Sequence, residues 1–162
     1  MILCLITDTS NARGEDSSYL QELIQRADAA SLQDQRYWHL LLHYRPTISG
    51  GYESEADEPG FFLAPDGKTN PKAELEATLA GFFSTELVGR SRQPARCALI
   101  ARYHWLKAAL SIDESRLPPE RCERFQAWLR ELNPASITVI FPSAYMNNPS
   151  SMFGHLLLRV DP

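Results

Sequence analysis

Apolar residues recur at helical spacing along the first part of the chain, which predicts helices. Ser17 is expected to cap a first helix whose apolar face spans residues 20–27. Ser31 is expected to cap a second helix that runs to Tyr44, and Arg45-Pro46 should end it because the residue before a proline disfavours helical backbone. The chain therefore begins as a helical region.

The helical pattern stops over residues 47–69, where glycine, proline and acidic residues dominate, as in the run SGGYESEADEPG. This composition predicts a loop, with a short extended piece at residues 61–63. Asn70-Pro71 then has the form of a helix start, a capping residue followed by proline in the first turn. A third helix should follow, with an apolar face made of Leu75, Leu79, Phe82 and Phe83.

The spacing of the apolar residues changes near the end of the chain. A fourth helix is expected over residues 95–110 and a fifth between Leu117-Pro118-Pro119 and Asn133-Pro134. Residues 137–141 then alternate and are rich in β-branched side chains, which predicts a strand. Residues 155–160 predict a second strand, so helices come first and strands last.

This order predicts an α+β fold that is predominantly helical. Two strands do not make a stable sheet on their own, so the strand pair should be the start of a larger sheet. We therefore expect a helical accessory region over residues 13–134, with its acidic loop at 47–69, and the first, incomplete part of a second domain over residues 135–162.

Composition limits the partners and the compartment. An apolar content of 44%, a charged content of 22% and a formal net charge of −4 are ordinary for a globular protein, and scattered Lys and Arg give no reason to expect nucleic acid. Residues 1–12, MILCLITDTSNA, join a short apolar run to a small-x-small pattern. They are interpreted as a partial export signal whose start lies upstream, with a frayed terminus or an edge strand as alternatives.

Cys97 and Cys122 each lie on a segment that is predicted to be helical. In an exported chain they can form a disulfide that closes a loop of about 25 residues and stabilises the fold by roughly 3.5 kcal/mol in the chain-entropy model. In a cytoplasmic chain they would be two buried thiols. Their spacing matches no zinc pattern, so no metal site is expected.

Four stretches of the chain together resemble one known family. They are YWHLLLHYRP, GFFLAPDGKTNPKAELEATLAGFF, CALIARYHWL and PSAYMNNPSSMFGHLLLRVD. These stretches look like the Lnb N-terminal periplasmic domain of bacterial envelope proteins, a family whose named activity is lipoprotein N-acylation. The resemblance covers residues 37–161, and its most specific part is NNPSSMFGH, where polar, small and aromatic residues surround one Gly-His pair.

The resemblance implies a fold and a mechanism. The family is similar to papain-like thiol enzymes of permuted order, such as the NlpC type, in which a His at the start of a strand precedes a nucleophilic Cys at the head of a helix. It implies that residues 135–162 begin such a sheet and that His155 raises the thiolate fraction of that Cys. The thiolate would accept an acyl chain from a phospholipid and pass it to the N-terminal amine of a lipoprotein, with no cofactor, in the periplasm or cell envelope.

The sequence departs from the family pattern because no cysteine follows His155. Cys97 and Cys122 lie upstream, where a disulfide is expected. The nucleophile is therefore expected in the rest of the same protein, C-terminal to residue 162, and this chain is expected to be a fragment without turnover of its own.

The residues around His155 are candidates for substrate-binding or supporting roles. Asn148 provides a turn with an exposed amide, and Gly154 allows a tight turn just before the strand. Ser150 and Ser151 could hydrogen-bond His155 or line an acyl pocket. The alternatives are an ordinary polar turn in which His155 bonds a neighbouring carbonyl, and a serine nucleophile with His155 as its base.

Other candidate residues favour structural roles. His39 and His43 are four residues apart on a predicted helix and could share a metal ion. However, no Glu follows His39 as a metalloprotease requires. Residues 102–105, RYHW, could form an aromatic and basic surface, although packing is favoured. The acidic run 53–58 is expected to be a solvated loop, with a lid or a docking segment as alternatives.

Two further functional hypotheses remain open from the sequence. The first is a non-catalytic envelope module, in which the helices and the acidic loop dock a partner protein and His155 is structural. The second is a fragment of a papain-like hydrolase.

Overall fold

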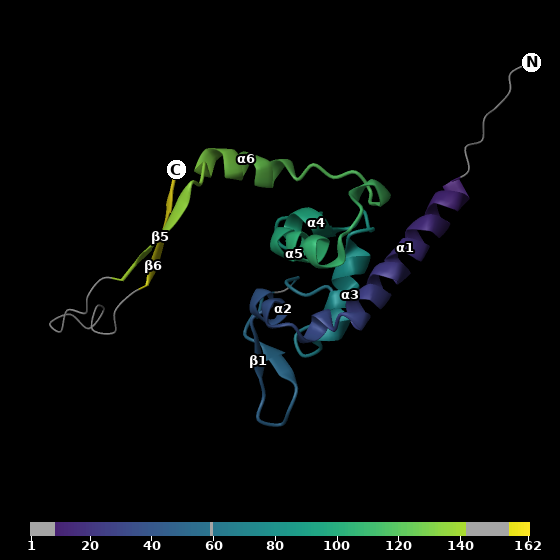
Figure 1. Ribbon diagram of the computed structural model, residues 1–162, viewed down its shortest axis with the longest axis horizontal. Coiled ribbons are helices and arrows are strands. Elements are labelled where there is room, and N and C mark those ends of the chain that lie inside the picture. Colours follow the sequence, from purple (N-terminus) through teal and green to yellow (C-terminus); the bar gives the residue numbers. More distant parts are fainter. Residues whose placement is uncertain (1–8, 59, 142–155) are drawn as a thin grey trace, which may run out of the picture. The chain divides into compact units, whose positions relative to one another are not determined.

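The computed structural model describes residues 9–58, 60–141 and 156–162, with side chains from residue 16 onward within these ranges (Figure 1). The chain divides into two compact units, Met1–Glu120 and Arg121–Pro162. Each unit is described by itself below.

The first unit is mainly helical. Its helices are α1 (Thr9–Ala29), α2 (Arg36–Leu41), α3 (Pro71–Gly81), α4 (Ala95–Ala98) and α5 (Ile100–Leu110), with short 3-10 helices η1 (Leu32–Asp34) and η2 (Glu114–Arg116). α1 contacts α3 and α5, and it lies alongside α3 in Figure 1. The core contains Leu23 of α1, Trp38 of α2, Leu79 of α3 and Leu106 of α5, none of which is exposed to solvent.

The predicted N-caps of the first two helices are wrong. α1 already begins at Thr9, so Ser17 lies within the helix. Ser31 has left-handed backbone (φ 48°) and its side chain caps nothing; it precedes η1, and α2 begins only after Gln35. α2 also ends at Leu41, well before Tyr44, and the hydroxyl of Ser54 donates to the free carbonyl of Leu42 at 2.5 Å.

The start of α3 is confirmed. The side chain of Asn70 accepts a hydrogen bond from the backbone N–H of Ala73 at 3.0 Å, and Pro71 occupies the first turn. Leu75, Leu79 and Phe82 are buried as predicted. This helix begins where local sequence alone places it, because the cap is a contact between residues three apart.

The predicted helix over residues 95–110 is interrupted. α4 ends at Ala98, and α5 begins at Ile100, because Leu99 (φ −113°, ψ 43°) leaves the helical region. The core face of α5 is as expected, with Tyr103 and Leu106 buried.

The acidic loop contains more regular structure than predicted. Residues Tyr44–Pro46 (β1) and Tyr52–Ser54 (β2) form an antiparallel hairpin, so part of the expected loop is a strand. Residues 61–63 are not a strand and are described below. A second small pair joins β3 (Leu87–Val88) and β4 (Gln93–Pro94).

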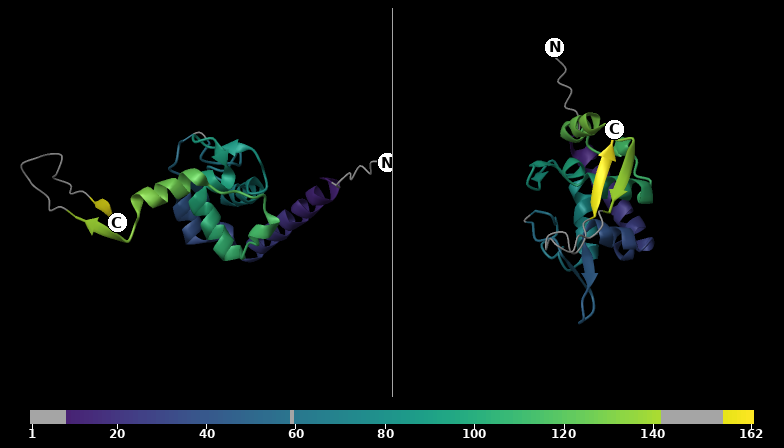
Figure 2. Two further views of the ribbon diagram at one scale, coloured as in Figure 1. Left: turned by 90° about the horizontal axis from the view of Figure 1, so that it is seen from above. Right: turned by 90° about the vertical axis from the view of Figure 1, so that its left-hand side faces the viewer.

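The second unit contains α6 (Glu123–Leu132), β5 (Ser136–Ile140) and β6 (Leu157–Asp161). α6 confirms the fifth predicted helix, although Cys122 precedes it as the N-cap. Both predicted strands are confirmed; they pair antiparallel and run side by side in Figure 2. The fold is thus α+β and rich in helix, as predicted.

One further prediction concerns export. Residues 1–8 of the expected signal segment lie outside the described residues, and residues 9–12 belong to α1. Within the part of the chain that the structure describes, no helix has the length and apolar character needed to cross a membrane.

Candidate functional site

The predicted catalytic His155 lies outside the described residues. So do the supporting candidates Asn148, Ser150, Ser151 and Gly154, which all fall within residues 142–155. Their roles therefore stay predictions. The structure does describe β5 and β6, the two strands that flank this segment.

The register of β5 and β6 gathers four aliphatic side chains on one face of the ladder. Ile137 pairs with Val160 and Val139 pairs with Leu158. Because side chains alternate along a strand, these four lie on the same face of the ladder. All four are solvent-exposed, with Ile137 and Leu158 at 67%. The ladder thus presents an uncovered hydrocarbon face.

The opposite face carries a small polar network. The hydroxyl of Thr138 donates to Asp161 at 2.6 Å, and Nε of Arg159 donates to the other carboxylate oxygen of Asp161 at 2.6 Å. Thr138 and Arg159 are direct cross-strand neighbours. Both carboxylate oxygens of Asp161 therefore accept hydrogen bonds within the ladder.

The cysteines Cys97 and Cys122 are both disulfide-bonded, in agreement with the prediction for an exported chain. A disulfide sulfur has no thiol proton to give to a base, so neither residue can act as the nucleophile in this state.

The most elaborate polar cluster among the described residues surrounds Glu74 on α3. Its carboxylate accepts hydrogen bonds from the backbone N–H of Leu63 (2.9 Å) and of Ala64 (2.8 Å). Nη1 of Arg102 on α5 donates to the same carboxylate at 2.6 Å, and the Glu74 side chain is not exposed at all. A buried carboxylate is tolerated there because a charge and two amides compensate its lost hydration.

Burial also governs the proton affinities in this cluster. It raises the pKa of the Glu74 carboxyl above its ordinary value, against the opposing effect of the backbone amides and Arg102. It lowers the pKa of the Arg102 guanidinium, although Glu74 opposes this change. Tyr44 lies nearby, and burial followed by the charge of Glu74 raises the pKa of its phenol.

This cluster was not predicted from the sequence. Arg102 was considered for an exposed basic surface, but only 3% of the residue is exposed, so that alternative is wrong. The available signal was the spacing of Glu74 and Thr78, which share the buried side of α3 with Leu75. Polar residues on an apolar helix face require partners.

The histidines His39 and His43 do not come together as a pair of ligands. Nε2 of His39 lies 2.8 Å from the carbonyl oxygen of Gln33, and its ring packs against Tyr52 at 4.2 Å between centroids. His43 is exposed, with left-handed backbone (φ 57°), and its ring lies 6.2 Å from Phe61. These three contacts are those of structural histidines.

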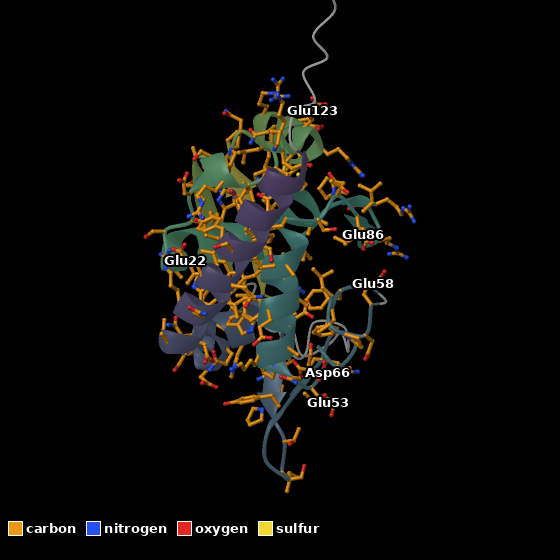
Figure 3. All side chains as sticks on the ribbon, turned by 90° about the vertical axis from the view of Figure 1, so that its right-hand side faces the viewer. Glu22, Glu53, Glu58, Asp66, Glu86 and Glu123 are labelled. Carbon is orange, nitrogen blue, oxygen red and sulfur yellow. The ribbon has the colours of Figure 1, made fainter. Side chains whose placement is uncertain are left out.

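Cations within the acidic loop and near it partly neutralise its carboxylates. Arg45 pairs with Glu55 at 3.0 Å, Lys68 pairs with Asp57, and Arg90 approaches Glu58 at 3.7 Å. Figure 3 shows Glu53, Glu58 and Asp66 along this loop. The ion pairs are exposed, and such pairs contribute little to stability.

Two known protein families match different parts of the chain. Residues 124–162 match the Lnb N-terminal periplasmic domain. Residues 30–109 match a domain of unknown function, DUF7843. No curated protein and no solved structure matches the chain. The resemblance to the Lnb family is confirmed for the segment with β5 and β6, whereas the three upstream stretches that suggested it lie within the region matched by the second family.

Proposed function

We propose that this chain, whose residues 124–162 match a periplasmic Lnb domain, is the N-terminal part of an envelope thiol acyltransferase. In this proposal His155 is the general base, and a cysteine C-terminal to residue 162 is the nucleophile. The family match is the observation that carries the proposal. The disulfide-bonded state of Cys97 and Cys122 supports it further, because disulfides are typical of proteins made for an oxidising compartment.

The proposed reaction is acyl transfer through a thioester. The imidazole of His155 takes the thiol proton, and the thiolate attacks the ester carbonyl of a phospholipid. The ester C–O bond breaks, and the lysophospholipid leaves as an alcohol with the proton returned by the imidazolium. The N-terminal amine of a lipoprotein then attacks the thioester, the C–S bond breaks, and an amide forms as the amine proton passes through His155 to restore the thiol.

The test uses the longer protein in which this chain continues past Pro162. His155→Ala and replacement of the downstream cysteine by Ala should each abolish N-acylation of lipoprotein, measured by mass spectrometry of the lipoprotein N-terminus. His104→Ala is the matched control, because this histidine lies on the exposed side of α5. Unchanged acylation in a folded His155→Ala protein would contradict the proposal.

That contradicting result would favour the second candidate, a non-catalytic envelope module that docks a partner. The supporting observation is the exposed acidic loop of the first unit (Figure 3). If the protein is instead a papain-like hydrolase, the unaltered protein should cleave esters without producing acylated lipoprotein. His155→Ala should then lose ester cleavage.

A further inference from the structure

The segment 61–68, called the strap here, is the last part of the loop over residues 47–69 and lies just before α3. It belongs to no helix and to no strand ladder. Two of its backbone N–H groups, those of Leu63 and Ala64, donate hydrogen bonds to the carboxylate of Glu74. These two backbone N–H groups therefore depend on a side chain of α3, whereas most buried backbone N–H groups bond to other backbone groups.

Arg102 holds the same strap from α5. Its Nη2 donates to the carbonyl oxygen of Phe61 at 2.6 Å while its Nη1 binds Glu74. The guanidinium also lies 4.6 Å from the centroid of the Phe61 ring. Glu74 and Arg102 are called the latch here. Glu74 binds backbone N–H groups of the strap, and Arg102 binds one of its carbonyl oxygens.

The strap also has backbone hydrogen bonds of its own, from Gly67 to Ala64 and from Phe61 to Glu58, and an ion pair between Lys68 and Asp57. The hydroxyl of Tyr44 donates to the carbonyl of Gly67, and the N–H of Ser54 donates to the carbonyl of Lys68 at 2.9 Å. The side chains of Phe61, Phe62 and Leu63 pack against the core but are only partly buried. Segments with few buried apolar contacts open locally at lower free energy than the core does.

Both ends of the strap suit a hinge. Gly60 precedes it with φ +83°, a conformation that glycine adopts at little cost. Asn70 follows it and caps α3 by accepting from Ala73, while its N–H and its side-chain amide donate to Asp66 of the strap. Opening breaks the two bonds to Asp66 and leaves the cap bond in place. The strap can leave α3 and α5 without unwinding either helix.

We propose that the strap is a lid that opens as a unit, separately from the core of the first unit, and that the Glu74–Arg102 latch holds it closed. Opening uncovers the buried latch and the Gly81 end of α3, where Leu63 packs closely enough that a side-chain carbon at Gly81 would approach its Cδ1 to 2.9 Å. The first unit thus carries a conformational device within the region matched by DUF7843.

The test is residue-resolved amide hydrogen exchange on the full 162-residue chain. In the unaltered protein, Leu63 and Ala64 should exchange faster than Leu79 and Leu106. Glu74→Gln should accelerate exchange at Leu63 and Ala64 by roughly ten- to a hundredfold, since a charge-assisted hydrogen bond is lost, and should leave the core amides much less affected. Glu76→Gln is the control on the same helix.

A second variant serves if Glu74→Gln does not fold. Tyr44→Phe removes only the hydroxyl that reaches Gly67, and it should accelerate strap exchange by roughly several-fold with core exchange unchanged. Equal acceleration of strap and core amides, or no acceleration of the strap, would overturn the proposal, because either result means that the strap opens only with global unfolding.

Discussion

The guanidinium of Arg102 and the carboxylate of Glu74 meet at 2.6 Å with side-chain exposures of 4% and 0%. They are 28 positions apart in the sequence and come from α5 and α3. This pair joins two helices and the strap at one buried point, so its loss should affect more than one element.

Arg102→Met should lower the free energy of unfolding by about 3–5 kcal/mol, because it leaves a buried carboxylate without its cation. Urea unfolding followed by tryptophan fluorescence measures this loss. Arg45→Met is the comparison, since Arg45 and Glu55 form an exposed pair, and it should cost less than about 1 kcal/mol. An equal loss of unfolding free energy in the two variants would mean that burial does not determine how much the Glu74–Arg102 pair contributes to stability.

Gly67→Ala should destabilise the strap by steric conflict. An added Cβ would lie 2.4 Å from Oε2 of Glu74 and 3.1 Å from the carbonyl oxygen of Ala64. Neither neighbour can move without breaking a hydrogen bond, so the expected cost is about 1–3 kcal/mol in thermal or urea unfolding.

Gly81→Ala is the matched comparison for Gly67→Ala. The nearest atom to its added Cβ is Cδ1 of Leu63, at 2.9 Å, which is the end of a side chain that can rotate. It should therefore cost less than Gly67→Ala, and the opposite order of the two costs would contradict this account.

Alkaline pH should destabilise the fold through Tyr103. Burial, and then the hydrogen bond to Glu114, raise the pKa of Tyr103 from the ordinary 10.0 to about 12. Below the ordinary value the phenol is protonated in both states, so its contribution to stability is fully present. As the pH rises toward the folded value, the unfolded chain loses a proton that the folded chain keeps, and stability falls.

Urea unfolding at a series of pH values through this window measures the effect. Tyr103→Phe should show a shallower alkaline decline, because the titrating phenol is absent. An unchanged slope in Tyr103→Phe would show that other groups cause the alkaline loss.

Asn70→Ala should lower the free energy of unfolding by about 1 kcal/mol, because the N–H of Ala73 loses its acceptor. Ser31→Ala should have little effect by comparison, since the Ser31 side chain makes no capping bond. Thermal unfolding of both variants distinguishes a cap that functions from one that only has the right residue type.

The sequence predicted those elements whose determinants are local. The cap at Asn70 depends on a neighbour three residues away, and the strand pair follows from the alternation of Ile137, Thr138 and Val139. The break at Leu99 could not be predicted, because the residues around it keep helical spacing and the interruption is a matter of backbone geometry. Ser17 has the residue type of a cap, but nothing in its own surroundings indicates that the helix starts eight residues earlier.

The candidate site was predicted less well for a different reason. The position of His155 came from a family resemblance, and its geometry lies outside the described residues. Neither the sequence pattern nor the family resemblance predicted the Glu74–Arg102 latch. Local periodicity contains no information about which distant residue, here 28 positions away, will contact a buried carboxylate. Tertiary packing makes that choice.

The alternation in β5 and β6 also determines how this part of the chain behaves at high concentration. Exposed aliphatic side chains on one face of a two-stranded ladder favour hydrophobic association between molecules through that face. Solubility should therefore decline as the chain is concentrated, and Val139→Thr, which keeps a β-branched shape but adds a hydroxyl, should improve it. The same four side chains that mark one face of the ladder thus set a practical limit on handling the protein by itself.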